Sequence, residues 1–432
     1  MVKFICKKPG KKSIAILKRD EKVISPSYAR EYSFVFKKGK GSYVYDVDNR
    51  KYLDFAAGIA VNNIGHANPE VIKAIKKQIP LGLHAAFGDF YAELPVIFTE
   101  NLLKFVPKNF QKVFLSNSGT ESIEAAYKLA RWHTKKKYVI AFANCFHGRT
   151  MGSLSMTNSK PVQRERFSPF LPVKHIPYPY VYRMPFKNEA DCTNYCINKI
   201  EKTIRYVKGN VAAIFMEPIQ GEGGYIVPPK NFPKEIRKIC NDHNILFCDD
   251  EVQAGCYRTG KFLAIENFNT LPDIISLSKA IGGGIPLGAT LASQKVMNWS
   301  PGSHSNTFGG NLVACTAGIA TLDYMKKHNL GENAAKIGKY ILKRLDEIKE
   351  KYEIIGDVRG LGLMIGVELV KNKRTKEHAI KERSSILCKA QEKGLILLPA
   401  GVSTIRICPP LIITKKEAEQ GLNILEDSLN KR

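Results

Sequence analysis

The alternation of short apolar segments with amphipathic ones constrains the fold of this chain more than any other feature of its sequence. From about residue 70 onward, segments with helical spacing accompany β-rich runs at 112–116, 138–142, 211–216, 244–250 and 273–278. Apolar strands of this length, separated by amphipathic helices, indicate a mostly parallel sheet covered on both faces. We therefore predict an α/β fold with a ligand crevice beyond the carboxyl ends of its strands.

Shorter β-rich segments near both ends of the chain indicate a second, smaller domain. Residues 41–55 place alternating aromatic residues around a polar turn, which is typical of a β-hairpin. The last part of the chain has long helical stretches followed by β-rich segments at 361–370 and 396–411. With 432 residues, the chain is about two to three times the commonest domain size. We expect a large domain over residues 70–318 and a small α/β domain built from residues 1–69 and 319–432.

The net charge of +26, from 66 lysines and arginines against 40 acidic residues, raises the question of a nucleic-acid partner. The lysines form short scattered clusters rather than one stripe interleaved with aromatic residues, and no zinc-finger, helix-turn-helix or RNA-binding signature is present. This pattern is typical of a solvated surface. A basic nucleic-acid-binding protein that has kept an enzyme fold is the alternative from another functional class, but we expect no nucleic-acid partner.

Hydropathy and cysteine usage together predict a cytoplasmic protein. No run of 18 or more apolar residues is present, and the amino-terminal segment lacks an apolar core followed by a cleavage site, so we expect neither a membrane span nor secretion. The ten cysteines have no CxxC spacing, which suggests a reducing compartment. Cys192 and Cys196 are four residues apart, but nothing nearby completes a zinc site. Buried free thiols are therefore expected there, and no metal.

Two of the predicted strands are followed by residues suited to binding anions and rings. After 112–116, a turn containing Gly119 leads into a helix, where free N–H groups form an anion site or Ser118 or Thr120 simply caps the helix. After 138–142 come Phe146, His147 and Arg149. The phenyl ring can stack on a planar ligand and the guanidinium can grip a carboxylate. We expect His147 to be a hydrogen-bonded structural histidine.

The next three strands are followed by charged residues. Glu217 and Glu222 follow 211–216, and paired carboxylates allow acid and base chemistry, although no sugar-binding aromatic platform supports a glycosidase. Asp250 ends one strand and Lys279 follows the next. A lysine in this position can form a Schiff base, and a buried acid nearby can pair with a ring nitrogen. Taken alone, the pair would instead be a salt bridge at the rim of the crevice.

Considered together, these segments resemble the class III pyridoxal-phosphate-dependent aminotransferases of fold type I, the group that contains 4-aminobutyrate and ornithine aminotransferases. The resemblance covers nearly the whole chain and extends from YVYDVDNRKYLDFAAGIAVNNIGH at 43–66 to RICPPL near the end. Between them lie, in order, SNSGTES, FHGRT, EPIQGEGG, DDEVQAGCYRTGK, SLSKAIGGGIPLGA, NTFGGNLVAC and VRGLGLMIGVEL. The chain looks closest to an archaeal branch that also includes amino-acid racemases.

The resemblance implies roles for these residues toward pyridoxal 5′-phosphate. Lys279 would hold the cofactor as an internal aldimine and later move a proton, and Asp250 would keep the pyridine nitrogen protonated. Gln253 would bond the ring hydroxyl. The remaining cofactor contacts implied by the family are Phe146 and Val252 on the ring faces, Gly119 and Thr120 at the phosphate, and Thr307 reaching the phosphate from a neighbouring subunit.

The resemblance also implies a substrate site formed by Ile59, Arg149, Glu222 and Arg406. Arg406 would bind an α-carboxylate, Glu222 would pair with Arg406 when the substrate has none, and Arg149 would hold a distal carboxylate. A buried guanidinium without a partner is costly, which gives this exchange a physical basis. Tyr32 is a candidate for the tyrosine that holds the δ-amine in ornithine enzymes.

The function expected from this resemblance is transfer of an amino group from an ω-amino donor to 2-oxoglutarate by a homo-oligomer, a dimer or higher. Its small-molecule partners would be an amino donor and a keto acid. The closest alternative is an amino-acid racemase on the same fold, in which the proton returns to the same carbon from the opposite face. Motifs that bind the cofactor do not separate the two reactions.

Overall fold

A seven-stranded sheet forms the centre of the molecule in the computed structural model, which describes residue 6 and residues 9–430. Its strand order is β4-β10-β9-β8-β7-β5-β6. In chain order, the strands are β4 (Lys112–Ser116), β5 (Tyr138–Phe142), β6 (Val173–Ile176), β7 (Val211–Met216), β8 (Leu246–Asp250), β9 (Ile274–Leu277) and β10 (Gly288–Ala292). Strands β6, β5, β7, β8 and β9 are parallel, so the predicted fold class is confirmed.

Strands β6 and β10 are the two that the sequence analysis did not predict. β10 runs antiparallel to both of its neighbours, β4 and β9. Its sequence, GATLA, is short and contains small residues, but all five residues are buried. β6 is a four-residue edge strand with only one buried residue. Neither strand therefore has the strongly apolar run by which the other five were identified.

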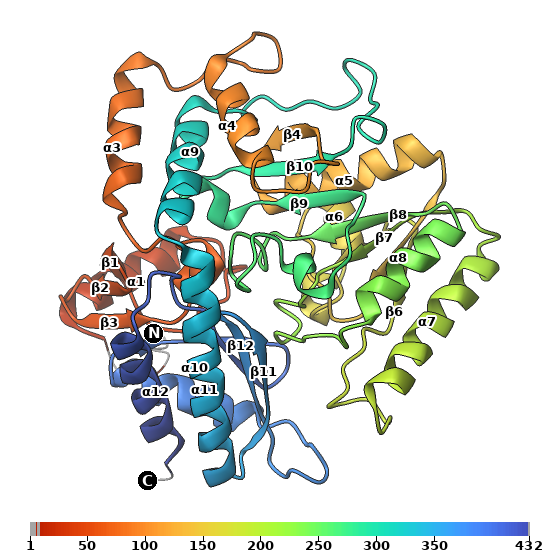
Figure 1. Ribbon diagram of the computed structural model, residues 1–432. Coiled ribbons are helices and arrows are strands. Elements are labelled where there is room, and N and C mark those ends of the chain that lie inside the picture. Colours follow the sequence, from red (N-terminus) through yellow and green to blue (C-terminus); the bar gives the residue numbers. More distant parts are fainter. Residues whose placement is uncertain (1–5, 7–8, 431–432) are drawn as a thin grey trace.

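Helices cover both faces of this sheet (Figure 1). On one face, Ile123, Ala126 and Leu129 of α5 (Gly119–Thr134) pack with Val139 and other small side chains of the sheet. On the opposite face, the main core joins the sheet to α7 (Glu189–Tyr206) and α8 (Phe232–Asp242). The remaining helices of this region are α6 (Met151–Met156) and the short 3-10 helices η2 (Pro161–Gln163), η3 (Ala264–Phe268) and η4 (Lys279–Gly282).

Two four-stranded sheets beside the central one combine both ends of the chain. The first has the order β1-β2-β3-β13 and contains β1 (Phe36–Lys40), β2 (Tyr43–Asp46), β3 (Lys51–Asp54) and β13 (Leu395–Ile396). The second has the order β11-β12-β15-β14 and contains β11 (Ile355–Leu361), β12 (Met364–Leu369), β14 (Leu398–Ala400) and β15 (Thr404–Ile407). β2 and β3 form the hairpin expected at 41–55. The domain boundaries at residues 69 and 318 stay a prediction.

Strand β13 joins the carboxyl-terminal part of the chain to the amino-terminal hairpin, because Leu395 pairs in parallel with Leu53 of β3. Helix α12 (Lys415–Leu429) packs over the same region, with Gly421 directly against the ring of Phe55. The other helices outside the central sheet are α2 (Ala57–Ala60), α3 (Pro69–Gln78), η1 (Ile79–Leu81), α4 (Glu93–Leu103), α9 (Leu312–Lys327), α10 (Leu330–Lys351) and α11 (Ile380–Glu392).

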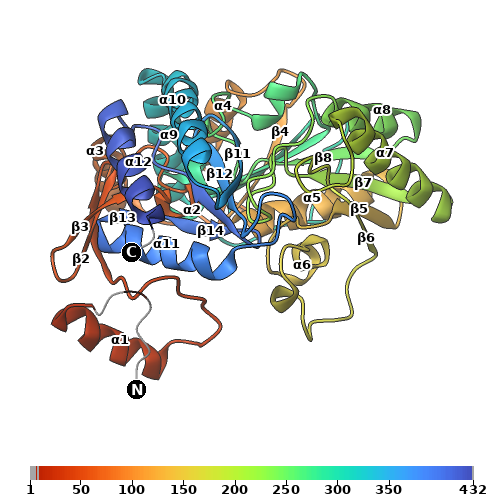
Figure 2. The same cartoon turned by 90° about the horizontal axis from the view of Figure 1, so that it is seen from below.

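Helix α1 (Lys11–Val23) lies apart from the rest of the molecule in the view of Figure 2. Just before it, Cys6 forms a disulfide with Cys388 of α11. The two residues are 382 positions apart, so sequence spacing gave no sign of the pair. The expected reducing compartment stays a prediction. The other eight cysteines are free and buried, including Cys192 and Cys196.

None of the helices in the described residues is both long and apolar enough to cross a membrane. Nor does this part of the chain bring together three or more histidine, cysteine, aspartate or glutamate side chains in a way that could hold a metal ion.

Candidate active site

A cavity of about 290 Å³ lies where strands of the central sheet end. Its walls come from the segments that follow β4, β5, β7, β8 and β9, so the crevice lies where the parallel sheet predicts it. The residues that line it are Ser118, Gly119, Thr120, Phe146, His147, Gly148, Arg149, Glu217, Asp250, Val252, Gln253 and Lys279.

Lys279 is the first residue of η4 and follows β9 directly. Its backbone has a φ of 46°, an uncommon conformation for a residue with a side chain, and such strain concentrates at functional positions. Burial lowers the pKa of Lys279, while the Asp250 and Glu217 carboxylates oppose that change. The structure therefore places a primary amine with an easily lost proton in the cavity.

Asp250, the last residue of β8, is held by two hydrogen bonds. Its Oδ2 lies 2.7 Å from Nδ1 of His147, and its Oδ1 accepts a 3.0 Å bond from the Val252 backbone N–H. Burial acts to lower the pKa of His147, but Cys145 and Asp250 outweigh it and hold that pKa above its ordinary value. The other ring nitrogen of His147, Nε2, is buried without a hydrogen-bond partner. His147 thus fixes the orientation of the Asp250 carboxylate.

Glu217 follows β7 and lies in the same wall of the cavity. Its carboxylate accepts hydrogen bonds from the Phe146 N–H at 3.0 Å and the Gly221 N–H at 2.9 Å. Burial raises the pKa of Glu217 to about 7, with Asp250 adding to the increase and His147 opposing it. Glu217 therefore ties two loops of the cavity together and titrates near neutral pH.

The amino terminus of α5 forms another part of the wall. Ser118 caps this helix by accepting a hydrogen bond from the Glu121 N–H, so the helix-capping interpretation is confirmed. A side chain at Gly119 would collide with Val252, since a Cβ there would lie 2.6 Å from Val252 Cγ1. The Thr120 hydroxyl bonds Ser153 Oγ at 2.6 Å. The first turn keeps its backbone close to the cavity, which suits an anion.

Planar and polar side chains complete the wall of the cavity. Phe146 and Val252 both line it, and the Arg149 guanidinium lies 5.7 Å from the centre of the Phe146 ring. The side-chain oxygen of Gln253 accepts a 3.0 Å hydrogen bond from the Tyr225 hydroxyl. The site therefore offers apolar surfaces for a flat ring beside groups that can bind its polar substituents.

Glu222 and Arg406 form an ion pair, as the sequence analysis expected, with 3.5 Å between Oε2 and Nη2. Arg406 lies in β15 and belongs to the second small sheet. It is close enough to the amine to contribute to the lowered pKa of Lys279. Lys160 also approaches Glu222, with Nζ 2.6 Å from Oε1.

Five predicted site residues lie outside the lining of this cavity: the Glu222–Arg406 pair just described, and Ile59, Thr307 and Tyr32. Ile59 is exposed and has a φ of 63° within α2. Thr307 is exposed in the segment before α9. The Tyr32 hydroxyl donates a hydrogen bond to the Leu397 carbonyl, between β13 and β14. Neither Ile59 nor Thr307 is among the side chains that surround Lys279 in this single chain.

Sequence reasoning missed two contacts. His147 was expected to be structural, but it lines the cavity and bonds Asp250; their strands, β5 and β8, are separated by β7, so the order along the chain gave no sign of the contact. Lys160 was not singled out, because it lies in a loop that has no pattern pointing to Glu222. The only available signal for His147 was its position near the end of a strand, and Lys160 had no such signal.

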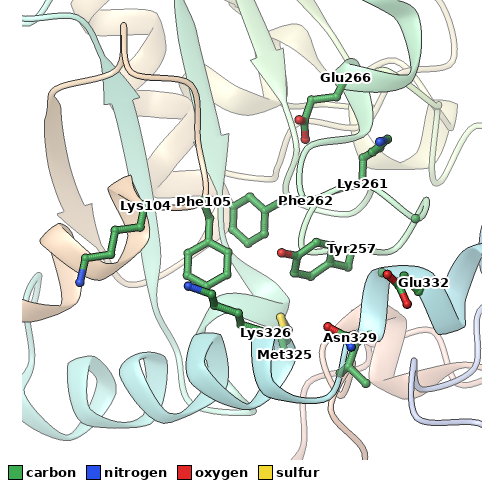
Figure 3. A pocket seen from close by; sticks show the side chains of 13 residues that line it. Lys104, Phe105, Tyr257, Lys261, Phe262, Glu266, Met325, Lys326, Asn329 and Glu332 are labelled. Atoms are coloured by element: carbon green, nitrogen blue, oxygen red, sulfur yellow. The ribbon is translucent and has the colours of Figure 1, made fainter.

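A second cavity, of about 420 Å³, shares no lining residue with the first (Figure 3). Figure 3 shows the rings of Phe105, Tyr257 and Phe262 close together, with Lys104 and Lys326 beside them. These lysines are exposed, and none of the predicted site residues takes part. The residues expected to carry the chemistry therefore do not contribute to this second cavity.

Comparisons with known proteins identify the family. Residues 24–429 match the family described as aminotransferase class-III. A leucine/methionine racemase of Thermococcus litoralis is 39% identical over 91% of this chain and 89% of its own length. An acetylornithine aminotransferase of Clostridium acetobutylicum is 38% identical over 93% of this chain and 98% of its own.

A solved structure extends the match to the cofactor. An amine transaminase from an uncultivated Pseudomonas species, in its pyridoxal-phosphate-bound form, superimposes with a TM-score of 0.89 at 31% identity, covering 94% of this chain and 97% of the other. The cofactor of this family is pyridoxal 5′-phosphate. The cavity fits it, because a buried lysine, a fixed carboxylate and a helix amino terminus converge there. The chain belongs to the class III aminotransferases, which are pyridoxal-phosphate-dependent enzymes of fold type I.

Proposed function

We propose that this protein moves an amino group from an ω-amino donor, such as 4-aminobutyrate or ornithine, to 2-oxoglutarate. The observation that carries the proposal is the Glu222–Arg406 pair close to Lys279. A donor of this kind reacts at an end that lacks a carboxylate, whereas 2-oxoglutarate presents an α-carboxylate there. Arg406 can serve both ligands, because Glu222 neutralises the guanidinium whenever the substrate brings no carboxylate to it.

Lys279 is assigned the covalent attachment of the cofactor and the movement of the substrate proton. The cofactor, when bound, supplies an electron sink for the negative charge that develops on the substrate carbon. The lowered pKa of Lys279 favours its neutral amine, which is the form able to accept a proton. Its place in a wall that also holds Asp250 and Glu217 keeps the resulting ammonium close to negative charge.

The other cofactor contacts follow from the arrangement of the cavity walls. Asp250, oriented by His147, would keep a ring nitrogen protonated, and Gln253 would bond the ring hydroxyl. Phe146 and Val252 would enclose the ring, while Gly119 and Thr120 at the start of α5 would hold the phosphate.

The substrate is assigned to the side of the cavity that faces the small domain. Arg406 would take an α-carboxylate and release Glu222, and Arg149 would take a distal carboxylate. Ile59 would contact the substrate chain from α2. This assignment gives each carboxylate of 2-oxoglutarate its own guanidinium.

Amino-acid racemisation is the second candidate, favoured by the 39% identity to a leucine/methionine racemase. The same lysine and arginine would serve an α-amino acid, with the proton returned to the carbon from the opposite face. No keto acid would then be consumed.

A homo-oligomer, a dimer or higher, is part of the proposal. The segment that contains His84 and Phe87 packs against the segment that contains Phe308 and Gly310. The His84 ring lies 5.2 Å from the Phe308 ring, and Gly310 lies against Phe87. The two segments display large apolar side chains, among them Leu81, Phe90, Tyr91 and Phe308. Exposed large apolar side chains that gather in one region mark association sites. Thr307, next to Phe308, would reach the phosphate of a neighbouring subunit.

The cytoplasmic location and the alternative function, nucleic-acid binding, stay predictions from the sequence. A cytoplasmic location rests on the hydropathy of the sequence and on the spacing of its cysteines. The net charge of +26 is the sole support for nucleic-acid binding, and a gel shift that persists at high salt would be needed to favour it.

A panel of amino donors tests the function. Purified holoenzyme is incubated with 4-aminobutyrate, ornithine, lysine, alanine or leucine, with and without 2-oxoglutarate, and the products are resolved by chiral chromatography. Transamination predicts glutamate that forms only in the presence of 2-oxoglutarate, fastest with an ω-amino donor. D-amino acid formed from alanine or leucine without any keto acid would establish racemisation instead.

A further inference from the structure

We propose that Lys160 is a positioning residue that controls substrate preference by holding Glu222 away from Arg406, which leaves the guanidinium open to an α-carboxylate. The inference rests on the proposed function only in taking Arg406 as the receptor for that carboxylate. It adds a third member to the Glu222–Arg406 pair, and thus a determinant of the balance between α-amino and ω-amino substrates.

The two contacts of Glu222 are unequal. Lys160 Nζ lies 2.6 Å from Oε1, within the range of a charge-assisted hydrogen bond. Arg406 Nη2 lies 3.5 Å from Oε2, beyond the usual 2.7–3.2 Å of an N–H···O bond. Glu222 is therefore bonded to the lysine and only loosely paired with the arginine.

Arg406 is left with unused donors. Its side chain is 7% exposed, and both Nε and Nη1 are buried with no hydrogen-bond partner. A buried charged donor without an acceptor is costly. A ligand carboxylate can accept two parallel N–H bonds from one guanidinium, so it would satisfy donors that Glu222 does not reach.

The backbone around Glu222 is fixed, so the exchange is a movement of side chains. The Glu222 carbonyl accepts a 2.7 Å hydrogen bond from the Gly401 N–H, and the Gly221 N–H donates to Glu217 at 2.9 Å. Lys160 is the most exposed of the three partners, with 38% of its side chain accessible to solvent. The lysine can therefore follow the carboxylate as Glu222 turns toward or away from Arg406.

Removal of Lys160 should change the contacts of Glu222, because Lys160 and Arg406 share its carboxylate. Without Lys160, Arg406 is the nearest counter-ion of Glu222. Glu222 would then close onto Arg406 and compete with any incoming α-carboxylate. Reaction of substrates whose reacting end carries no carboxylate should be favoured by the same change. With these substrates, Glu222 has to neutralise Arg406.

The test compares Lys160→Met, which keeps the apolar stem, with Lys160→Arg, which keeps the charge. Lys187→Met, at an exposed lysine, is the matched control. NMR in D₂O follows loss of the Cα proton of L-alanine and of the Cγ proton of 4-aminobutyrate by each holoenzyme; these exchanges accompany transamination and racemisation alike. Calorimetry measures the affinity for propionate, a carboxylate with no amine to react.

We expect Lys160→Met to lower kcat/KM for L-alanine relative to that for 4-aminobutyrate about tenfold, mainly through KM, because one charge-assisted contact is removed. The propionate affinity should fall in parallel. Lys160→Arg should restore both quantities, and Lys187→Met should leave them unchanged. An unaltered ratio and an unaltered propionate affinity in Lys160→Met would overturn the inference.

A double-mutant cycle with Glu222→Gln identifies the route of the effect. If Lys160 acts through Glu222, Lys160→Met should have no further effect on propionate affinity once Glu222 is glutamine. A loss that persists in that background would mean that Lys160 binds the carboxylate itself, and the inference would be wrong. A wild-type enzyme that exchanges neither proton would refute the proposed function, while the propionate affinities would still decide this inference.

Discussion

The imidazole of His147 and the carboxylate of Asp250 lie 2.7 Å apart in a place where neither is open to solvent. Because His147 fixes the carboxylate that we propose to bind the cofactor ring nitrogen, His147→Ala should weaken cofactor affinity about tenfold or more, the cost of leaving a buried charged acceptor without its partner. Titration of the apoenzyme with pyridoxal 5′-phosphate measures the change. His175→Ala is the control, since His175 bonds the Met156 carbonyl and does not line the cavity.

Lys279→Ala should abolish both the visible absorption of the bound cofactor and the activity. No other lysine lines the described cavity, so no second amine can replace it. Absorption spectra of the purified variant provide the measurement, and far-ultraviolet circular dichroism checks that it is folded. Lys295→Ala, at an exposed lysine, should keep both properties. A normal absorption band in Lys279→Ala would show that the cofactor is held elsewhere.

Glu217 should make the protein less stable as the pH rises from about 4.5 to about 7. Its pKa is raised from 4.5 to about 7, so the folded state binds the proton more tightly than the unfolded state does. The contribution of Glu217 to the free energy of unfolding, about 1–3 kcal/mol, is complete below the pKa of the unfolded state. It is lost as the pH rises through the pKa of the folded state. Glu217→Gln should remove this part of the pH dependence, as urea unfolding at pH 5 and pH 8 would measure. An unchanged difference between the two pH values would contradict the assignment.

Gly421→Ala should destabilise the protein, although alanine normally favours a helix over glycine by about 1 kcal/mol. A Cβ at this position of α12 would lie 2.1 Å from Cζ of Phe55, which is completely buried. Overpacking of this kind costs about 1–3 kcal/mol. Thermal denaturation compares the variant with Glu419→Ala, an exposed substitution in the same helix that should have little effect. A more stable Gly421→Ala protein would mean that α12 can move away from the hairpin.

Alkylation of the unfolded, unreduced protein should modify eight cysteines, and prior reduction should raise the number to ten. The difference corresponds to Cys6 and Cys388. Intact-mass spectrometry counts the modified thiols, and Cys388→Ser should leave Cys6 reactive without reduction. Ten reactive thiols in the unreduced protein would mean that the pair is open in solution.

The sequence predicts the central sheet well because five of its strands are apolar runs whose period and length are local properties. It also predicts where the chemistry lies, because side chains that follow parallel strands share one edge of the sheet; Asp250 and Lys279 meet there as expected. Composition, periodicity and spacing do not show pairing between distant segments, and the Glu222–Arg406 pair was expected only from the family resemblance. The contact of His147 with Asp250, that of Lys160 with Glu222, and the Cys6–Cys388 bond all join loops or ends whose approach depends on the complete fold.

The two small sheets have a consequence for synthesis on the ribosome. Every side chain that lines the cavity lies between residues 118 and 279, whereas Arg406 follows 406 − 279 = 127 residues later, on β15. At ordinary elongation rates that interval lasts roughly 6 to 25 seconds. A nascent chain therefore possesses the groups proposed to hold the cofactor well before it possesses the arginine proposed to select the substrate. A message truncated near its end would yield protein that retains the first set of groups and lacks the second.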